Sequence, residues 1–198
     1  MKNWSKVLLI TFCAVCLVAA SVMGTIAAIT AKTQTVTNTF TIGNITLTLD
    51  ESDVNELGDL ESQDRVTENR YKLFANATYM KDPTVHVTED SESCYIFVVV
   101  NNGISAIEAG GEDPTIASQI TENGWTSLNG STEIYWRTHT GNQKVDYKVF
   151  DNFTIGDIGI NQLLDYKDAT ITITAYAIQS EGIDTPESAW EQLDPVVN

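Results

Sequence analysis

Hydrophobic and polar positions alternate with a period of two along several short segments of this chain, and turn residues separate these segments. The longest regular run covers residues 33–42, with threonine at every odd position and, at the even positions, Gln34, Val36, Asn38, Phe40 and Ile42. Side chains two residues apart lie on the same face of a strand, so this alternation predicts an extended strand. The phase shifts by one residue at Gly43 and Asn44, which predicts a bulge or tight bend before the apolar positions resume at Ile45.

Further strands are predicted where β-branched and aromatic residues dominate, at residues 84–88, 94–101, 125–128, 133–138, 144–150 and 169–179. The segment 94–101 is apolar on both faces, so we expect a central strand buried between two layers. The sequence His-Thr-Gly-Asn at 139–142 predicts a hairpin turn between the two strands that flank it. The acidic stretch 50–70 and the segment 103–114 are predicted to be loops.

Two helices complete the predicted elements. Thr185 and Pro186 suit the cap and the first position of a C-terminal helix, and residues 161–166 are expected to form another short helix. Seven or eight short strands separated by turns are typical of two packed antiparallel sheets. The sequence therefore predicts an all-β fold, a jelly-roll-like antiparallel β-sandwich with a short C-terminal helix.

The start of the chain differs in composition from the rest. Lys2 and Lys6 precede an apolar stretch at 7–22, and small residues follow that stretch. A basic start, an apolar middle and a small-residue end are typical of a secretory signal peptide. The alternative is a retained membrane anchor, because the apolar character continues weakly to Ile29 and is long enough to span a bilayer.

Cleavage of this signal is expected between Ala27 and Ala28, since small side chains suit the peptidase cleft. Residues 1–27 are then the signal peptide. The remaining residues 28–198 are predicted to form a single β-sandwich domain with an N-terminal strand arm at about 28–42.

The charge of the chain limits its partners. Acidic residues outnumber basic residues 27 to 11, which gives a formal net charge of -16 at pH 7. No basic patch is available to neutralise phosphates, so we expect no nucleic-acid partner and no membrane contact after cleavage. Hydrophobic residues make up 42% of the chain and fall in ordered runs, which argues for a folded domain rather than a disordered one.

Cysteine usage is sparse. Cys13 and Cys16 lie in the segment that cleavage removes, which leaves Cys94 as the only thiol of the mature chain. A lone cysteine can be a reactive group, can pair between chains, or can be a buried and inert thiol. The apolar run that Cys94 opens favours the buried thiol.

A search for catalytic motifs finds none. The two histidines belong to no His-Glu-x-x-His helix, and there is no nucleophile turn, phosphate-binding Gly-rich loop or mature Cys-x-x-Cys pair. His86 alternates with two valines and is expected on the solvent face of a strand. We therefore predict no enzyme activity, with no catalytic, cofactor-binding or metal-binding residues and no cofactor.

Carboxylates cluster at residues 50–53, 89–92 and 112–113. Calcium requires several such oxygens converging on one point, and none of the clusters has the spacing of an EF-hand loop. Solvated acidic loops are the favoured interpretation, and calcium binding stays the alternative.

The alternating arm begins directly after the expected cleavage site, so cleavage would release a free strand. Its unpaired backbone groups can bond to the sheet of its own domain or to the open edge of a neighbouring copy. The sequence leaves both arrangements open.

Three parts of the chain resemble the TasA/camelysin family of secreted proteins. They are the segment 24–29 followed by 36–45, the segment 79–87, and the segment 175–179 with 185–190. The N-terminal part is the most specific, because its motif is tied to a position beside the cleavage site. Relatives often have Pro-Gly in the turn before 79–87, where this chain has Ala75 and Asn76; Asn can adopt the left-handed conformation that Gly would supply.

The resemblance implies a jelly-roll domain exported from a Gram-positive-type cell after cleavage by a SipW-type signal peptidase. It also implies self-association into extracellular biofilm-matrix filaments, in which the N-terminal strand of one subunit completes the sheet of the next. The candidate donor-strand side chains are then Val36, Asn38, Phe40 and Ile42.

Two other hypotheses remain. A monomeric cell-surface module could bind a carbohydrate, a cation or a host protein through Trp125, Tyr135 and Trp136, although we expect at least two of these to pack in the core. Camelysin relatives have been labelled metalloproteases, but this chain lacks the ligand set that such an activity requires.

Overall fold

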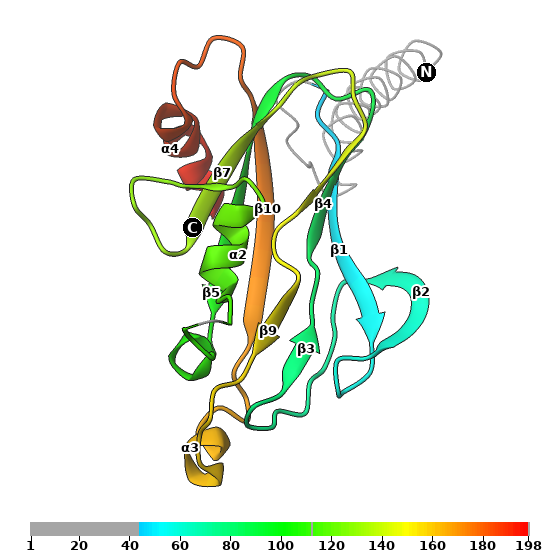
Figure 1. The fold of residues 1–198 in the computed structure, drawn as a ribbon. Coiled ribbons are helices and arrows are strands. Elements are labelled where there is room, and N and C mark those ends of the chain that lie inside the picture. Colours follow the sequence, from blue (N-terminus) through cyan, green and yellow to red (C-terminus); the bar gives the residue numbers. More distant parts are fainter. Residues whose placement is uncertain (1–43, 112, 198) are drawn as a thin grey trace, which may run out of the picture. The chain divides into compact units, whose positions relative to one another are not determined.

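The computed structural model describes residues 44–111 and 113–197, and this part of the chain is built mainly from strands (Figure 1). The strands are β1 (Leu47–Val54), β2 (Leu60–Val66), β3 (Thr78–Met80), β4 (Thr84–Val87), β5 (Cys94–Asn102), β6 (Thr126–Ser127), β7 (Ile134–His139), β8 (Val145–Lys148), β9 (Asn152–Thr154) and β10 (Ile171–Gln179). The helical segments are η1 (Ser105–Ile107), α2 (Ile116–Glu122), α3 (Ile160–Leu164) and α4 (Pro186–Val197).

Two four-stranded sheets, with the orders β2-β1-β4-β8 and β10-β5-β7-β6, form the two layers, and β3 pairs with β9 in a small third sheet. Every pairing is antiparallel. The chain passes from the first layer to the second between β4 and β5 and returns between β7 and β8. The predicted all-β, jelly-roll-like sandwich with a short C-terminal helix is therefore confirmed.

The main core lies between the layers. Val85 and Val87 of β4 and Ile96 and Val98 of β5 belong to one buried cluster, and none of the four is more than 1% exposed. Alternate residues of a strand point to the same face, so the β-branched side chains at these positions fill the space between the sheets. Removal of this apolar surface from water stabilises the fold.

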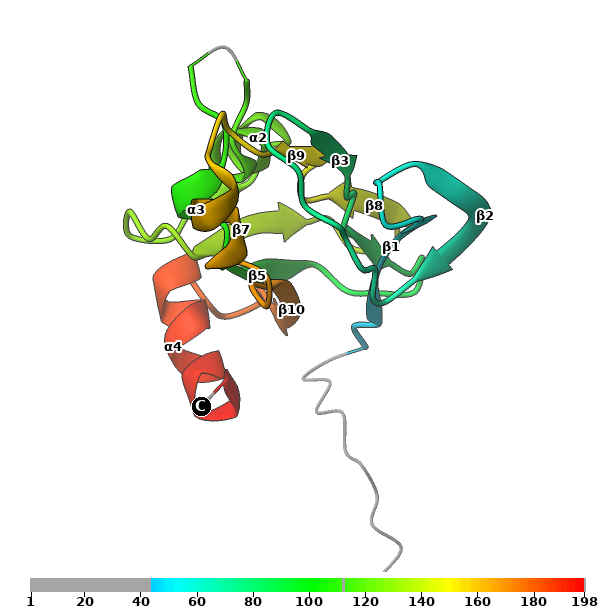
Figure 2. The ribbon, with the colours of Figure 1, turned by 90° about the horizontal axis from the view of Figure 1, so that it is seen from below.

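A second apolar cluster covers the outer face of the β10-β5-β7-β6 sheet. Phe97 of β5 and Ile178 of β10 pack there with Ala189 and Leu193 of α4. In Figure 2, α4 lies beside β5 and β10, on the side away from β1. The strand predicted at 94–101 is thus buried on both faces, as expected.

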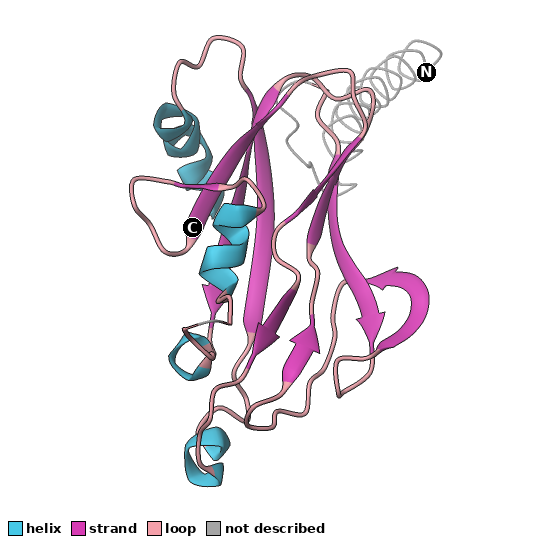
Figure 3. Cartoon of the chain, in the orientation of Figure 1, coloured by secondary structure: helices cyan, strands magenta, loops and turns pink. Residues whose placement is uncertain are grey.

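Both predicted helices are present (Figure 3). The hydroxyl of Thr185 accepts a hydrogen bond from the backbone N–H of Ser188 at 3.2 Å, the capping role that the sequence predicts. Pro186 is the first residue of α4, where its missing N–H leaves no helical bond unmade.

The prediction that residues 50–70 form a loop is wrong. β1 continues to Val54, and β2 pairs with it, with Glu51 opposite Val66. β2 has the sequence Leu-Glu-Ser-Gln-Asp-Arg-Val and is largely exposed on both faces. An edge strand exposed in this way needs no apolar alternation, so the pattern gives no sign of it.

The hairpin predicted at 139–142 is also wrong, because β7 and β8 belong to different sheets. This segment instead carries the chain from one layer to the other. A Cβ atom on Gly141 would lie 2.7 Å from the backbone nitrogen of Ser93. The segment 139–142 therefore passes too close to the start of β5 for position 141 to carry a side chain.

The turn before β3 follows the expectation for Asn76. Its φ of 58° lies in the left-handed region that glycine would otherwise supply. The amide of Asn76 also donates to Asp157 at 3.1 Å, which holds the turn against the segment after β9.

Candidate functional site

A groove of about 970 Å³ opens between β1 of one sheet and β10 of the other. One wall comes from β1, from the last residue of β2 and from the segment that follows β2. The opposite wall comes from residues 166–173, which lead into β10. The apolar lining side chains include Leu49, Leu73, Ile104, Phe153, Ile171 and Ile173.

Both strands that border this groove have an edge without a partner strand among the described residues. β10 pairs with β5 along its whole length and with no other strand. β1 pairs with β4 over Leu47–Asp50, whereas its other edge pairs with β2 only from Glu51 onward. Backbone N–H and C=O groups require hydrogen-bond partners, and within residues 44–111 and 113–197 no strand supplies them along these edges.

The core-facing side chains of these two edges are incompletely covered. Leu49 of β1 is only partly buried, whereas Val85, its direct partner on β4, is 0% exposed. On the other sheet Ile173 is partly buried, and its partner Val100 is 3% exposed. Among the described residues, apolar cover is therefore incomplete along one line, between β1 and β10.

A charged pair lies at the floor of the groove. The Lys81 ammonium is 2.5 Å from one carboxylate oxygen of Glu51, and the two side chains are only 8% and 6% exposed. The other carboxylate oxygen accepts a hydrogen bond from the side-chain amide of Asn69 at 3.0 Å. Glu51 comes from β1, Asn69 from the segment after β2, and Lys81 from the segment after β3.

Aromatic side chains pack beside this pair. The rings of Tyr79 and Phe153 are stacked at 5.0 Å, and Tyr71 meets both of them edge-on. The Lys81 ammonium lies 5.9 Å from the centre of the Tyr71 ring. Burial, together with the charges of Glu51 and Asp82, raises the pKa of Tyr71, so its hydroxyl stays protonated and donates to the Met80 carbonyl.

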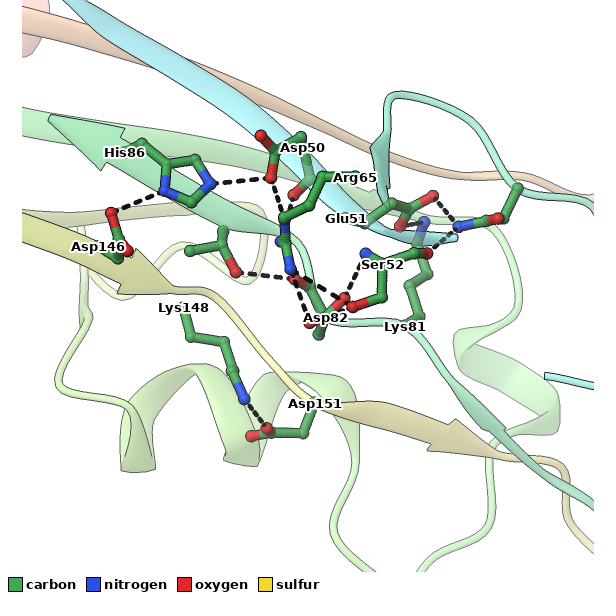
Figure 4. A network of polar contacts seen from close by, with 12 residues as sticks. Asp50, Glu51, Ser52, Arg65, Lys81, Asp82, His86, Asp146, Lys148 and Asp151 are labelled. Carbon is green, nitrogen blue, oxygen red and sulfur yellow. Dashed lines mark hydrogen bonds and ion pairs between the residues drawn. The ribbon is translucent and has the colours of Figure 1, made fainter. Parts of the chain in front are cut away.

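A row of alternating charges crosses the outer face of the β2-β1-β4-β8 sheet (Figure 4). Arg65 of β2 pairs with Asp50 of β1 and with Asp82. The two ring nitrogens of His86 lie 2.8 Å from Asp50 and 2.7 Å from Asp146. A ring that faces a carboxylate on each side is best satisfied as the doubly protonated imidazolium, which donates to both.

The pKa values in this row follow from the pairing. Burial alone would lower the pKa of His86, but the hydrogen bonds and charges of Asp146 and Asp50 outweigh it and raise that pKa above its usual value. Burial alone would raise the pKa of Asp50, but His86 and Arg65 lower it. The solvent-face position predicted for His86 is thus correct, while its ionic partners were not foreseen.

Several residues that the sequence singles out lie outside the described part of the chain. They are the cleavage residues Ala27 and Ala28 and the donor-strand residues Val36, Asn38, Phe40 and Ile42. Their assignments stay predictions.

The aromatic residues considered for surface binding are mostly in the core. Trp125 is 1% exposed and Tyr135 is 4% exposed, and Trp136 is partly buried against the edge of Tyr95. The expectation that at least two of them pack in the core is confirmed.

The acidic cluster at residues 50–53 is not a solvated loop. Asp50 and Glu51 are held in the ion pairs described above, and Asp53 accepts a hydrogen bond from the Ser62 hydroxyl. Within residues 44–111 and 113–197, no group of three or more His, Cys, Asp or Glu side chains is placed to hold a metal ion.

Cys94 is 0% exposed at the start of β5, which confirms the expected buried thiol. Burial raises the pKa of this thiol to about 12.

Sequence reasoning missed the Glu51–Lys81 pair and its amide neighbour. The two charged residues are separated by 30 positions and come from different elements, so no local pattern connects them. A lysine three residues before the predicted strand at 84–88 was the one visible sign, and a charged residue close to a strand end is ordinary.

No protein-family model, curated protein or solved structure matches the chain. In the part of the chain that the structure describes, no helix has the length and apolar character needed to cross a membrane.

Proposed function

We propose that this chain is a secreted structural protein of the cell surface or biofilm matrix, a fibre subunit that assembles by donor-strand exchange. The observation that carries the proposal is the line of missing cover between β1 and β10. In the described part of the chain, two strand edges without a partner strand and two rows of incompletely buried apolar side chains border one groove. An added strand would supply both backbone partners and apolar cover.

The proposed occupant is the N-terminal arm of a second copy. Residues 33–42 alternate in the way that an inserted strand requires, with one row of side chains for the core and one for the outside. Val36, Phe40 and Ile42 would enter the neighbour's groove, and the threonines would face outward. β10 has nine residues, so it is long enough to pair with nearly all of this alternating segment.

The arm starts from a fixed point. Asn44 accepts a hydrogen bond from the Glu92 N–H at 3.0 Å, and its amide donates to the Asp90 carbonyl at 3.0 Å. These bonds hold the chain beside the turn between β4 and β5 just before β1 begins. An arm that filled its own groove beside β1 would have to reverse direction within the few residues before Asn44, whereas an arm that enters a neighbour continues without a turn.

Insertion requires some movement of the sheets. A strand placed between two paired neighbours needs about 10 Å between them, twice the usual spacing of about 4.8 Å. Cα atoms of β1 and β10 come within 8 Å of each other in places. We therefore expect these two strands to separate locally when the arm enters.

Deletion of residues 28–39 from the mature protein tests the proposal. The truncated protein should stay folded and monomeric and should form no filaments in electron micrographs. Filaments of normal appearance from the truncated protein would show that the arm is not the joint. A mature full-length protein that remains monomeric at high concentration would instead favour an arm held in its own groove, or a monomeric binding module.

A pair of substitutions on β10 tests the acceptor side. Ile173→Glu places a charge on the groove face, and Thr174→Glu places the same charge on the opposite, exposed face. We expect the first to prevent addition of subunits and the second to leave it unchanged. Equal filament yields from both variants would show that β10 does not receive the arm.

A further inference from the structure

The Glu51 carboxylate contacts an amine and an amide at the same time. One oxygen lies 2.5 Å from Nζ of Lys81, and the other accepts from Nδ2 of Asn69 at 3.0 Å. A carboxylate in this position can take a proton through one oxygen and return it through the other. Proton transfer between an amine and an amide needs both of these contacts, whereas a stabilising ion pair needs only the contact with Lys81.

The Asn69 amide is held in a fixed orientation. Its oxygen accepts a hydrogen bond from the backbone N–H of Val54 at 3.1 Å, and its nitrogen also donates to the Ser52 carbonyl at 2.8 Å. The Val54 N–H would stabilise negative charge that develops on the amide oxygen when the amide carbon is attacked. The amide nitrogen, which would leave, already contacts the Glu51 carboxylate that can protonate it.

The surroundings exclude most water. Lys81 and Glu51 are nearly fully buried, and the Tyr71 ring lies beside the ammonium. Electrostatic interactions are stronger in such a site, and hydrolysis of a reacting amide is suppressed. Glu51, Asn69 and Lys81 all line the groove between β1 and β10, so a small product has a path to solvent.

We propose that Lys81 and Asn69 react within the folded chain to form an amide cross-link, with Glu51 as the proton-transfer group. Glu51 takes a proton from the Lys81 ammonium, and the neutral Nζ attacks Cγ of Asn69. The Nζ–Cγ bond forms, and Glu51 delivers this proton to Nδ2 as the Cγ–Nδ2 bond breaks and ammonia departs. Glu51 then takes the second proton that Nζ loses on becoming the amide nitrogen and passes it to the ammonia. The products are one secondary amide and one ammonium ion, so no oxidant, cofactor or added reactant is required.

The cross-link would change how the groove wall is held. It would join the segment after β2 to the segment after β3 through a covalent bond beside the C-terminal half of β1. The inference does not depend on the proposed fibre assembly, since the reaction needs only the folded domain.

Mass spectrometry of the intact mature protein tests the proposal, with the N-terminus determined independently. The measured mass should be lower than the sequence mass by one molecule of ammonia. Trypsin should then release residues 66–70 attached to the fragment that contains Lys81, with no cleavage after Lys81. A succinimide at Asn69 would give the same mass loss without this branched peptide, so the peptide decides between them.

Matched variants locate the chemistry. Lys81→Met, Asn69→Ala and Glu51→Gln should each have the full mass expected for their sequence and give no branched peptide. Lys148→Met removes a lysine from the exposed pair with Asp151 and should retain both the mass loss and the cross-link.

The wild-type protein alone can overturn the proposal, even where a variant fails to fold. If folded wild-type protein has the full sequence mass and trypsin cleaves freely after Lys81, the three side chains form only a non-covalent pair and the inference is wrong. A cross-link that forms equally in Glu51→Gln would exclude Glu51 as the proton-transfer group.

Discussion

Leu49 and Val85 are direct partners across β1 and β4 and point to the same side of the sheet, yet only Val85 is closed off from solvent. In a β-sandwich the inner faces of the two sheets pack against each other. Two core-facing strand partners are therefore expected to be buried to a similar extent. The difference places the gap in the fold beside β1. Ile173 and Val100 show the same relationship on the β10 side.

Hydrogen exchange should detect the unpaired edges. In protein lacking residues 28–39, we expect the backbone amides of β10 that do not bond to β5 to exchange rapidly, because they have no strand partner. In assembled material the same amides should exchange slowly. The amides of Ile96 and Val98 in β5 should be slow in both states, and rapid exchange of the β10 edge in filaments would contradict insertion at this site.

The stability that His86 provides should depend on pH. Its pKa is raised in the folded state, so its contribution is fully present below its unfolded value, near pH 6.5, and is lost as the pH rises through the folded pKa. The pKa of Asp50 is lowered, so that contribution is present above about pH 4 and is lost as the pH falls further.

His86→Gln should therefore lower the free energy of unfolding by about 0.5–1 kcal/mol at about pH 5.5 and by much less at about pH 9. Urea unfolding of both proteins at the two pH values gives the comparison. Lys148→Gln, in a separate exposed pair with Asp151, should show no such difference between the two pH values. An effect of His86→Gln that grows with pH would contradict the charged row.

Gly58 should be intolerant of a side chain. Its φ is +82°, and an added Cβ would lie 2.7 Å from Cα of Tyr79, a backbone atom that cannot move aside alone. We expect Gly58→Ala to cost at least about 2 kcal/mol, from the left-handed conformation and the clash together. Gly130 has a similar φ of +74° with open space around it, so Gly130→Ala should cost only about 1 kcal/mol. Equal losses in urea unfolding would show that the close approach to Tyr79 has no effect.

Cys94 should be unreactive in the folded protein. Its thiol is fully buried and its pKa is raised to about 12, so little thiolate is present or accessible at neutral pH. A disulfide reagent that measures thiols should react only as fast as the protein opens, and at once in concentrated denaturant. Rapid stoichiometric reaction with folded protein would contradict the buried position.

The strands with the clearest patterns were predictable because they are buried. β5 is apolar on both faces since a sheet covers one side and α4 the other, and β10 alternates because one of its faces lies toward the core. β2 was missed because an exposed edge strand has no apolar face to keep. α2 was missed because it has only seven residues, although Thr115 caps it through the Ser118 N–H at 3.3 Å.

The candidate sites were less predictable than the fold. The groove is a property of the sheet edges, and sequence patterns state which residues form strands but not which edges remain unpaired. The Glu51–Lys81 pair unites residues from separate elements, so it becomes visible only when the chain is folded. The segment 139–142 has ordinary turn residues for a hairpin, yet it joins different layers. The residues of a turn determine its local backbone conformation, but they do not determine which sheet the next strand joins.

α4 has a consequence for the empty side of β10. Tyr176 of β10 packs edge-on against Trp190 of α4 at 6.0 Å, and Ile178 is buried under the same helix. The helix thus supports a strand that, among the described residues, has a neighbouring strand on only one edge. An incoming strand would pair with a β10 that α4 already holds in place. Most of the conformational entropy lost on binding would therefore be lost by the incoming strand. Weakening of α4 should therefore reduce affinity at a surface that the helix never touches.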